Sequence, residues 1–188
     1  MSHQNGYFIA IEGMDGSGKT NVVIPALAEF LKTRLIDPLL TREPGGTPCG
    51  ELIRELTKHP VCKDVDHTVL ALLMSASRRD HVVRTIIPAL AKGSVVVSDR
   101  YIASTVMYQH DAKDLSRIVE IGCAGLLPDL VIMLDIPYEV YCQRLAERSD
   151  AATQVQDHLD VMDATLFNKR RAATVSYTHL TLPTKRIV

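Results

Sequence analysis

The chain has 188 residues, 46% of them hydrophobic, which suffices for one substantial core but not for two ordinary domains. Its 21 Lys and Arg residues nearly balance 22 Asp and Glu residues, so no overall positive field recruits a nucleic acid. Any anion site must therefore be built locally, and a small phosphorylated ligand is favoured over a polymer.

No segment approaches the roughly 20 consecutive apolar residues of a membrane span, and the polar residues 1–6 do not resemble a signal peptide. The four cysteines are scattered, without the close spacing of a metal site or a disulfide framework. We therefore expect a cytoplasmic protein with reduced thiols that binds neither a membrane nor a nucleic acid.

Short apolar segments rich in β-branched residues alternate along the chain with longer segments of helical periodicity. We expect strands at residues 7–12, 38–42, 95–98 and 130–136. We expect helices at about residues 19–33, 67–92 with a kink at Pro88, 114–123 and 137–148. This alternation predicts an α/β fold, a three-layer sandwich with a parallel sheet in the middle.

A glycine-rich loop directly follows the first expected strand. Residues 13–20 read Gly-Met-Asp-Gly-Ser-Gly-Lys-Thr, which is the spacing of a phosphate-binding loop, or P-loop. Glycines let backbone N–H groups turn toward phosphate oxygens, and the following helix adds the positive end of its dipole. Lys19 would add a positive charge, and Thr20 would offer its hydroxyl to Mg²⁺. The residues expected to bind a nucleotide are Gly13, Gly16, Ser17, Gly18, Lys19 and Thr20.

Asp15 is an acidic residue inside a loop built for anions, so its side chain should point outward, toward a second ligand. The carboxyl ends of parallel strands face one crevice, so Arg42, Asp99 and Arg100 should converge beside the loop. Arginine binds phosphate through a planar, bidentate fork. We therefore expect a second phosphate site here, with Asp99 as the outer-sphere partner of Mg²⁺.

Taken in order, four features resemble the signature of the thymidylate kinase family: Asp15, residues 41–47, Arg78 with His81, and residues 99–109. The resemblance covers residues 7–171. It implies the P-loop nucleoside-monophosphate kinase fold and the transfer of a phosphoryl group from ATP to dTMP with Mg²⁺. It also implies ATP and dTMP as small-molecule partners, and a homodimer.

The resemblance further implies roles for individual residues in dTMP binding. Arg42 and Arg100 would hold the phosphate, and Arg78 would reach the thymine carbonyl. Tyr108 would exclude a ribose 2′-hydroxyl by its bulk, while Asp15 would sense the 3′-hydroxyl. The remaining residues expected at the base or sugar are Met74, Thr105 and Gln109.

Residues 143–148 resemble the beginning of the bacterial-type lid, which we expect at about residues 144–160. The P-loop has Gly16 where other subgroups carry an arginine, so a lid arginine should supply the missing charge over ATP. Arg148 is the first candidate and Arg144 the second. The expected catalytic residues are then Lys19, Asp15, Arg100 and Arg148.

The chain departs from the family pattern at two positions. Met74 stands where the family usually has an aromatic ring, so a kinase for another deoxynucleoside monophosphate is an alternative. In the lid, His158 replaces an arginine within residues 157–160. This replacement, together with the missing strand and helix described in the next paragraph, favours a second alternative. In that alternative, the chain is a nucleotide-binding fragment without turnover.

The kinase domain is expected to span residues 1–174 and to lack the last strand and helix of the family. Residues 175–188 are expected to be a non-native tail, because residues 175–184 resemble the in-frame translation of a transposase sequencing adapter. The Val, Tyr and Thr residues of this tail still favour a strand.

Overall fold

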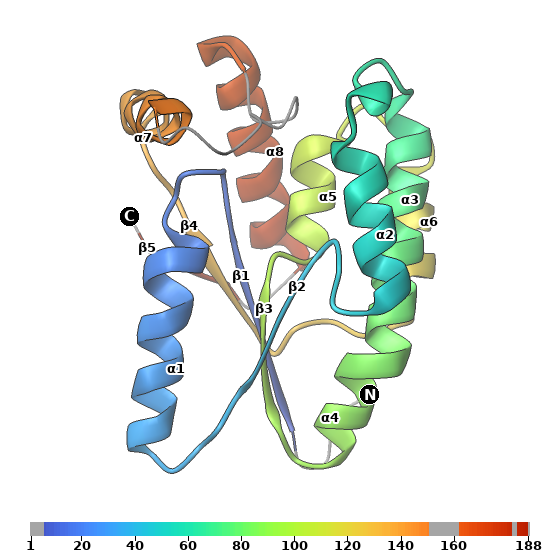
Figure 1. The fold of residues 1–188 in the computed structure, drawn as a ribbon. Helices are drawn as coiled ribbons and strands as arrows, with labels where there is room; N and C mark the ends of the chain where they lie inside the picture. Colours follow the sequence, from blue (N-terminus) through green and yellow to red (C-terminus); the bar gives the residue numbers. More distant parts are fainter. Residues whose placement is uncertain (1–5, 151–161, 182–183, 188) are drawn as a thin grey trace.

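A single parallel sheet forms the centre of the computed structural model, which describes residues 6–150, 162–181 and 184–187, with side chains over residues 6–147 and 162–174. The strand order is β2-β3-β1-β4-β5, and every pairing is parallel. The predicted α/β fold is therefore confirmed (Figure 1). The strands are β1 (Tyr7–Gly13), β2 (Leu39–Arg42), β3 (Val95–Asp99), β4 (Leu130–Leu134) and β5 (Thr184–Ile187).

In the described part of the chain, eight α-helices connect and cover the strands. None of the helices in the described ranges combines the length and the apolar character that a membrane span requires. The helices are α1 (Ile24–Thr33), α2 (Pro48–Lys58), α3 (His67–His81), α4 (Ile87–Ala91), α5 (Ile102–Tyr108), α6 (Leu115–Cys123), α7 (Tyr138–Asp150) and α8 (Ala164–Thr181). Three short helical turns are η1 (Lys19–Val23), η2 (Pro60–Cys62) and η3 (Val82–Ile86).

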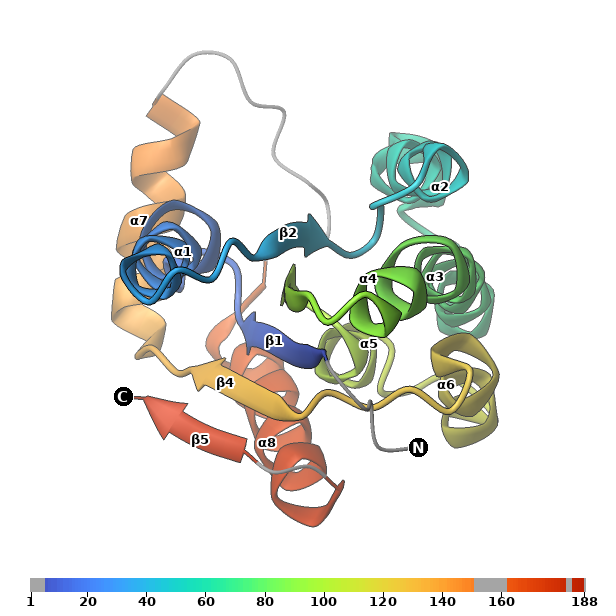
Figure 2. The ribbon, with the colours of Figure 1, turned by 90° about the horizontal axis from the view of Figure 1, so that it is seen from below.

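The two faces of the sheet follow from the alternation of side chains along β1. Phe8 and Ala10 pack in a core with α4, α5 and α6, whereas Ile9 and Ile11 pack in a second core with α1. Viewed along the strands, α1 lies on one side of the sheet and α3 to α6 lie on the other (Figure 2). Because both faces are covered, the middle strands β1, β3 and β4 consist mainly of apolar residues, as in other parallel sheets, and their polar residues lie near their carboxyl ends.

The predicted helix at residues 67–92 is interrupted rather than continuous. It consists of α3, the π-helical turn η3 and α4, and Pro88 stands at the beginning of α4. Proline lacks the N–H of a helical hydrogen bond, and a π-helical turn accommodates that loss. The predicted helix is therefore interrupted at η3, just before Pro88, whereas α2 and α5 were not predicted.

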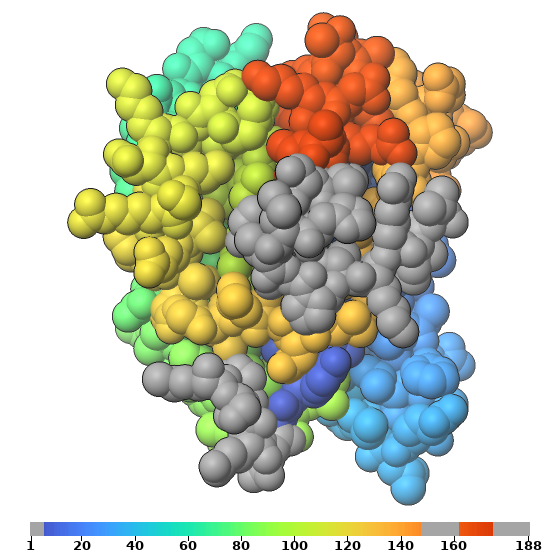
Figure 3. All heavy atoms as spheres, turned by 180° about the vertical axis from the view of Figure 1, so that it is seen from behind, coloured from blue at the N-terminus to red at the C-terminus, as the bar shows by residue number. Residues whose placement is uncertain are grey.

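A third core cluster lies beneath the P-loop and joins it to the last helices. It contains Met14 of the loop together with Met107, Tyr141 and Phe167, from α5, α7 and α8. From behind, the first turns of α8 lie between α6 and α7 (Figure 3). The segment after the lid therefore helps to support the P-loop from below.

At the end of the chain, the expected tail adds a strand to the sheet. The strand β5 pairs with β4 from Val131↔Thr184 to Leu134↔Ile187, and α8 runs through residue 174, the predicted domain boundary. An open β4 edge offers unpaired backbone groups, and the β-branched Thr184 and Ile187 fit such an edge, whereas Val175, Tyr177 and Thr178 lie in α8 and not in a strand. Strand propensity at a free edge therefore gives the sheet a fifth strand.

Phe8 provides a test of the larger core. Its side chain is fully buried, and its ring meets Tyr101 edge to face at 5.0 Å. Replacing Phe8 with Ala should lower the free energy of unfolding by about 3–5 kcal/mol, measured by urea denaturation. Phe30→Ala removes the same ring from a half-exposed position and serves as the control. Equal losses for the two variants would contradict this core assignment.

Candidate active site

The P-loop joins the end of β1 to η1 as a tight turn. Gly13, Gly16 and Gly18 have φ values of 144°, 74° and 90°, which favour glycine. A Cβ atom at Gly13 would also lie 2.5 Å from the carbonyl oxygen of Leu134 on β4. Backbone conformation and close packing therefore both require glycine in this loop.

Lys19 folds back across the loop. Its side chain is buried, and Nζ donates hydrogen bonds to the carbonyl oxygens of Gly13 and Met14, each at 2.8 Å, and to Ser17 Oγ at 3.3 Å. Burial, and then the positive charge of Arg100, lower the pKa of Lys19 from 10.5 to about 8. A phosphate at this position would act in the opposite direction and favour the charged amine.

Thr20 and Asp99 lie together next to the loop. The Thr20 hydroxyl donates to Asp99 Oδ2, across from η1 to the end of β3. The other carboxylate oxygen, Oδ1, is buried and has no hydrogen-bond partner among the side chains and backbone that the structure describes. A hydroxyl and a carboxylate are oxygen ligands of the kind that Mg²⁺ prefers. The predicted metal residues therefore fit this ion.

Arg100 connects β3 with the P-loop. Its Nη2 donates to Asp15 Oδ1 at 2.5 Å, and its Nη1 donates to the Gly13 carbonyl oxygen at 3.2 Å. The Tyr108 hydroxyl donates to the other oxygen of Asp15, and the Arg100 guanidinium carbon lies 5.4 Å from the Tyr108 ring centre. Although burial favours the neutral form, Asp15 raises the pKa of Arg100, which therefore remains charged. Three predicted site residues thus meet at one point.

Arg78 is a buried cation with three hydrogen bonds. Nε donates to Glu43 Oε2 at 2.7 Å, and Nη2 donates to the Tyr101 carbonyl oxygen at 2.9 Å and to Thr105 Oγ1 at 2.7 Å. Burial opposes the charge, but the carboxylate of Glu43 outweighs it and raises the pKa of Arg78. Its Nη1 is buried without a hydrogen-bond partner within the described side-chain ranges. This nitrogen could therefore donate to a carbonyl group of a ligand.

Glu43 also holds His81, the second buried residue of the same motif. His81 Nδ1 lies 3.1 Å from Glu43 Oε1, and His81 Nε2 lies 2.6 Å from Thr41 Oγ1. The chain of contacts from Thr41 through His81 and Glu43 to Arg78 joins β2 to α3. A satisfied polar network of this kind fixes the direction of the guanidinium.

The remaining predicted acceptor residues lie around this centre. Arg42 is opposite Asp99 in the sheet register, but its guanidinium binds Glu51 of α2 at 2.8 Å and is half-exposed. Met74 is half-buried on α3, one turn before Arg78. Gln109 is buried at the end of α5. The structure thus pairs Arg100 with Asp15 and Arg78 with Glu43 and Thr105, whereas Arg42 pairs with Glu51.

Of the two predicted lid arginines, Arg144 reaches the P-loop. Its Nη1 donates to the carbonyl oxygen of Gly16 at 2.6 Å. Arg148 falls within α7, but its side chain lies outside the described residues, as do the side chains of residues 157–160 with His158. The helix α7, in which the expected lid begins, therefore contacts the P-loop through Arg144.

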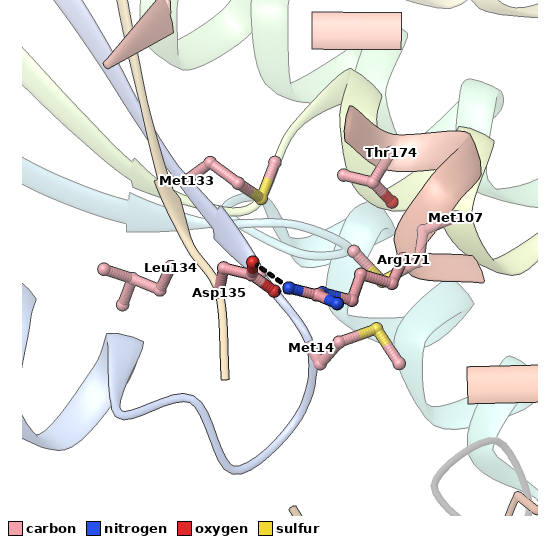
Figure 4. Close-up of a pocket in the computed structure, with 8 residues that line it drawn as sticks. Met14, Met107, Met133, Leu134, Asp135, Arg171 and Thr174 are labelled. Carbon is pink, nitrogen blue, oxygen red and sulfur yellow. Dashed lines mark hydrogen bonds and ion pairs between the residues drawn. The ribbon is translucent and has the colours of Figure 1, made fainter. Parts of the chain in front are cut away.

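Behind the P-loop, a small pocket is bridged by an ion pair that was not predicted (Figure 4). Asp135, just after β4, accepts from Nε and Nη2 of Arg171 on α8, both at 2.5 Å. Hydrogen bonding to this carboxylate raises the pKa of Arg171. Met14 of the loop lines the same pocket. The bidentate pair therefore fixes α8 against the strand next to the P-loop.

Sequence reasoning missed three carboxylates of this region, Glu12, Glu43 and Glu51. Glu12 and Glu43 are only 1% and 4% exposed, so each must be paired to be buried. A signal was present for Glu12, because it alternates with Phe8 and Ala10 along β1 and so faces the core.

The Glu43 network gives a stability prediction. Glu43→Ala would leave the guanidinium of Arg78 buried without its carboxylate, and should lower the free energy of unfolding by about 3–5 kcal/mol in urea denaturation. Glu51→Ala removes the partner of the half-exposed Arg42 and should cost about 1 kcal/mol. If both variants lose the same small amount of unfolding free energy, the interpretation that Glu43 compensates the buried charge of Arg78 is wrong.

The sequence matches those of known proteins. The thymidylate kinase family model matches residues 11–179. A thymidylate kinase of Leuconostoc citreum is 44% identical over 73% of this chain and 67% of its own length. Thymidylate kinases of Cereibacter sphaeroides and Pediococcus pentosaceus are 41% and 37% identical, over 89% and 90% of this chain and 79% and 82% of theirs. The chain therefore belongs to the thymidylate kinase family.

Proposed function

We propose that this chain transfers the γ-phosphoryl group of ATP to dTMP, which gives dTDP. Family membership supports this reaction. The geometric support comes from one atom of the site, the carbonyl oxygen of Gly13. The carbonyl oxygen of Gly13 accepts from Lys19 Nζ at 2.8 Å and from Arg100 Nη1 at 3.2 Å. The cation for the donor phosphates and the cation for the acceptor phosphate are thus adjacent. Phosphoryl transfer depends mainly on such positioning and charge.

On the donor side, the loop amides and Lys19 hold the phosphates of ATP. Thr20 and Asp99 would hold Mg²⁺, with Asp99 as its outer-sphere partner. When bound, this ion neutralises part of the charge on the transferred group. Arg144, already hydrogen-bonded to Gly16, and Arg148 supply the lid charge over ATP.

On the acceptor side, Arg100 and Arg42 hold the phosphate of dTMP. The carboxylate of Asp15 receives the 3′-hydroxyl, and the ring of Tyr108 excludes a 2′-hydroxyl. Arg78 donates from Nη1, the buried nitrogen without a described partner, to a base carbonyl. The residues that complete the base and sugar contacts are Met74, Thr105 and Gln109.

A kinase for another deoxynucleoside monophosphate is the second candidate, and Met74 is the observation behind it. Met74 lies one turn from Arg78, on the side of α3 that the base would meet. A flexible thioether fills space without the flat face that an aromatic ring offers to a base. Selection of thymine would then depend more heavily on Arg78.

The proposal also includes a homodimer. Val69 and Leu72 of α3 and Val83 of η3 are about half-exposed, at 46%, 53% and 47%. Together they form an apolar stripe on the helical face, which a second copy would cover. Sedimentation velocity would separate a dimer from a monomer. The cytoplasmic location stays a prediction.

A coupled assay tests the function. With ATP and Mg²⁺, ADP should form fastest with dTMP when dTMP, dUMP, dGMP and dCMP are compared, and Lys19→Ala should abolish transfer. Faster turnover of another acceptor would favour the second candidate. Binding of ATP and dTMP without ADP formation would show a nucleotide-binding fragment without turnover.

Arg100→Ala should chiefly impair the use of the acceptor. Loss of a preorganised, buried cation should lower kcat/KM for dTMP by about 10²–10³-fold, while KM for ATP changes much less. Arg79→Ala, at an exposed position next to Arg78, should leave both parameters unchanged. Unchanged dTMP kinetics in Arg100→Ala would remove the acceptor-site assignment.

The lowered pKa of Lys19 predicts proton uptake on nucleotide binding. At pH 8 the amine of the free protein is about half charged, and a bound triphosphate restores the charge, so roughly half a proton should be taken up per ATP. Calorimetric titrations in two buffers of different ionisation enthalpy measure this number. Lys19→Arg stays charged at every pH used and should take up none. Equal uptake by both proteins would assign the proton to another group.

A further inference from the structure

Glu12 is a buried carboxylate for which the proposed reaction has no direct use. It is the residue before Gly13, at the end of β1, and is 1% exposed. Both oxygens are satisfied: Oε1 accepts from the backbone N–H of Tyr101 at 2.8 Å, and Oε2 accepts from Ser104 Oγ at 2.6 Å. Both partners belong to the segment that begins with Arg100.

Glu12 and Arg100 together fix the direction in which the Ser104 hydroxyl points its hydrogen. A carboxylate can only accept, and a guanidinium can only donate. The single hydrogen of Ser104 Oγ therefore points to Glu12, and a lone pair of the same oxygen accepts from Arg100 Nη1 at 3.0 Å. Glu12 thus orients an acceptor toward the guanidinium.

The backbone contact acts on the same arginine. Arg100 has a φ of 73°, in the left-handed region that is strained for residues other than glycine. Its neighbour Tyr101 is held by Glu12, and its own N–H donates to the carbonyl oxygen of Ile11 at 2.9 Å. Two contacts from β1 therefore fix the turn from which the Arg100 side chain extends.

The opposite charges of Glu12 and Arg100 also link these two residues. Burial raises the pKa of Glu12, while the hydrogen bond from Ser104 and the positive charge of Arg100 act against that rise. The carboxylate and the guanidinium therefore stabilise each other through the hydroxyl that lies between them.

We propose that Glu12 and Ser104 are positioning residues that hold the Arg100 guanidinium at the phosphate end of the acceptor site. The inference rests on the proposed function of Arg100, and neither residue touches a substrate in it. If Glu12 and Ser104 had a purely structural role, their substitution would lower the free energy of unfolding without selectively changing the kinetics for dTMP.

A double-mutant cycle separates these roles. Ser104→Ala, Arg100→Ala and the double variant are compared with the original protein for kcat/KM with dTMP and for KM with ATP. Ser104→Ala alone should lower kcat/KM for dTMP by about tenfold and leave KM for ATP within about twofold, since it loosens a charged hydrogen bond. In the Arg100→Ala background, the same substitution should have no further effect.

Two further variants complete the design. Ser75→Ala removes another buried serine hydroxyl, which donates to the Ile118 carbonyl oxygen at 2.9 Å, and should leave both kinetic parameters unchanged. Glu12→Gln keeps the shape of the side chain and should show the same acceptor-selective loss, so it carries the test if Ser104→Ala does not fold.

The outcomes are distinguishable. Equal effects of Ser104→Ala in both backgrounds would overturn the positioning role and leave the role of Arg100 intact. A neutral Arg100→Ala would overturn the acceptor-site proposal itself, and the positioning role with it.

Discussion

The bond between Arg100 and Asp15 is the interaction on which the site depends. Arg100 directly follows β3, and Asp15 lies in the P-loop after β1, so this pair joins the ends of the two strands that carry the proposed donor and acceptor sites. The same guanidinium donates to Gly13, whose carbonyl oxygen also accepts from Lys19. If the pair were lost, Asp15 would lose the cation that balances its charge beside the loop and would keep the Tyr108 hydroxyl as a partner.

Buried charges set the remaining geometry. Arg78 and Arg100 are each held by a carboxylate, Glu43 and Asp15 respectively, so neither cation must lose its charge on burial. Such pairs add little net stability, but removal of one partner is costly, which keeps the side chains in one arrangement. The site is therefore preorganised for anions before any ligand binds.

The sequence predicted the sheet and the P-loop because both depend on local patterns. Apolar, β-branched segments mark buried parallel strands, and the spacing of Gly13, Gly18 and Lys19 follows from backbone geometry. Convergence of Arg100 with Asp15 followed from the rule for the carboxyl ends of parallel strands. The helix α5 was missed because it is buried on nearly all sides and so lacks an amphipathic pattern. The partner of Arg42 was missed because Glu51 lies on α2, which was not predicted.

The most direct test of the central claim is the affinity of one molecule that joins adenosine to thymidine through a chain of five phosphates. If the two phosphate sites face each other across Gly13, this ligand should bind at least about 10²-fold more tightly than ATP, because the second site is engaged at high effective concentration. An affinity no greater than that of ATP would contradict the arrangement of the two sites described above.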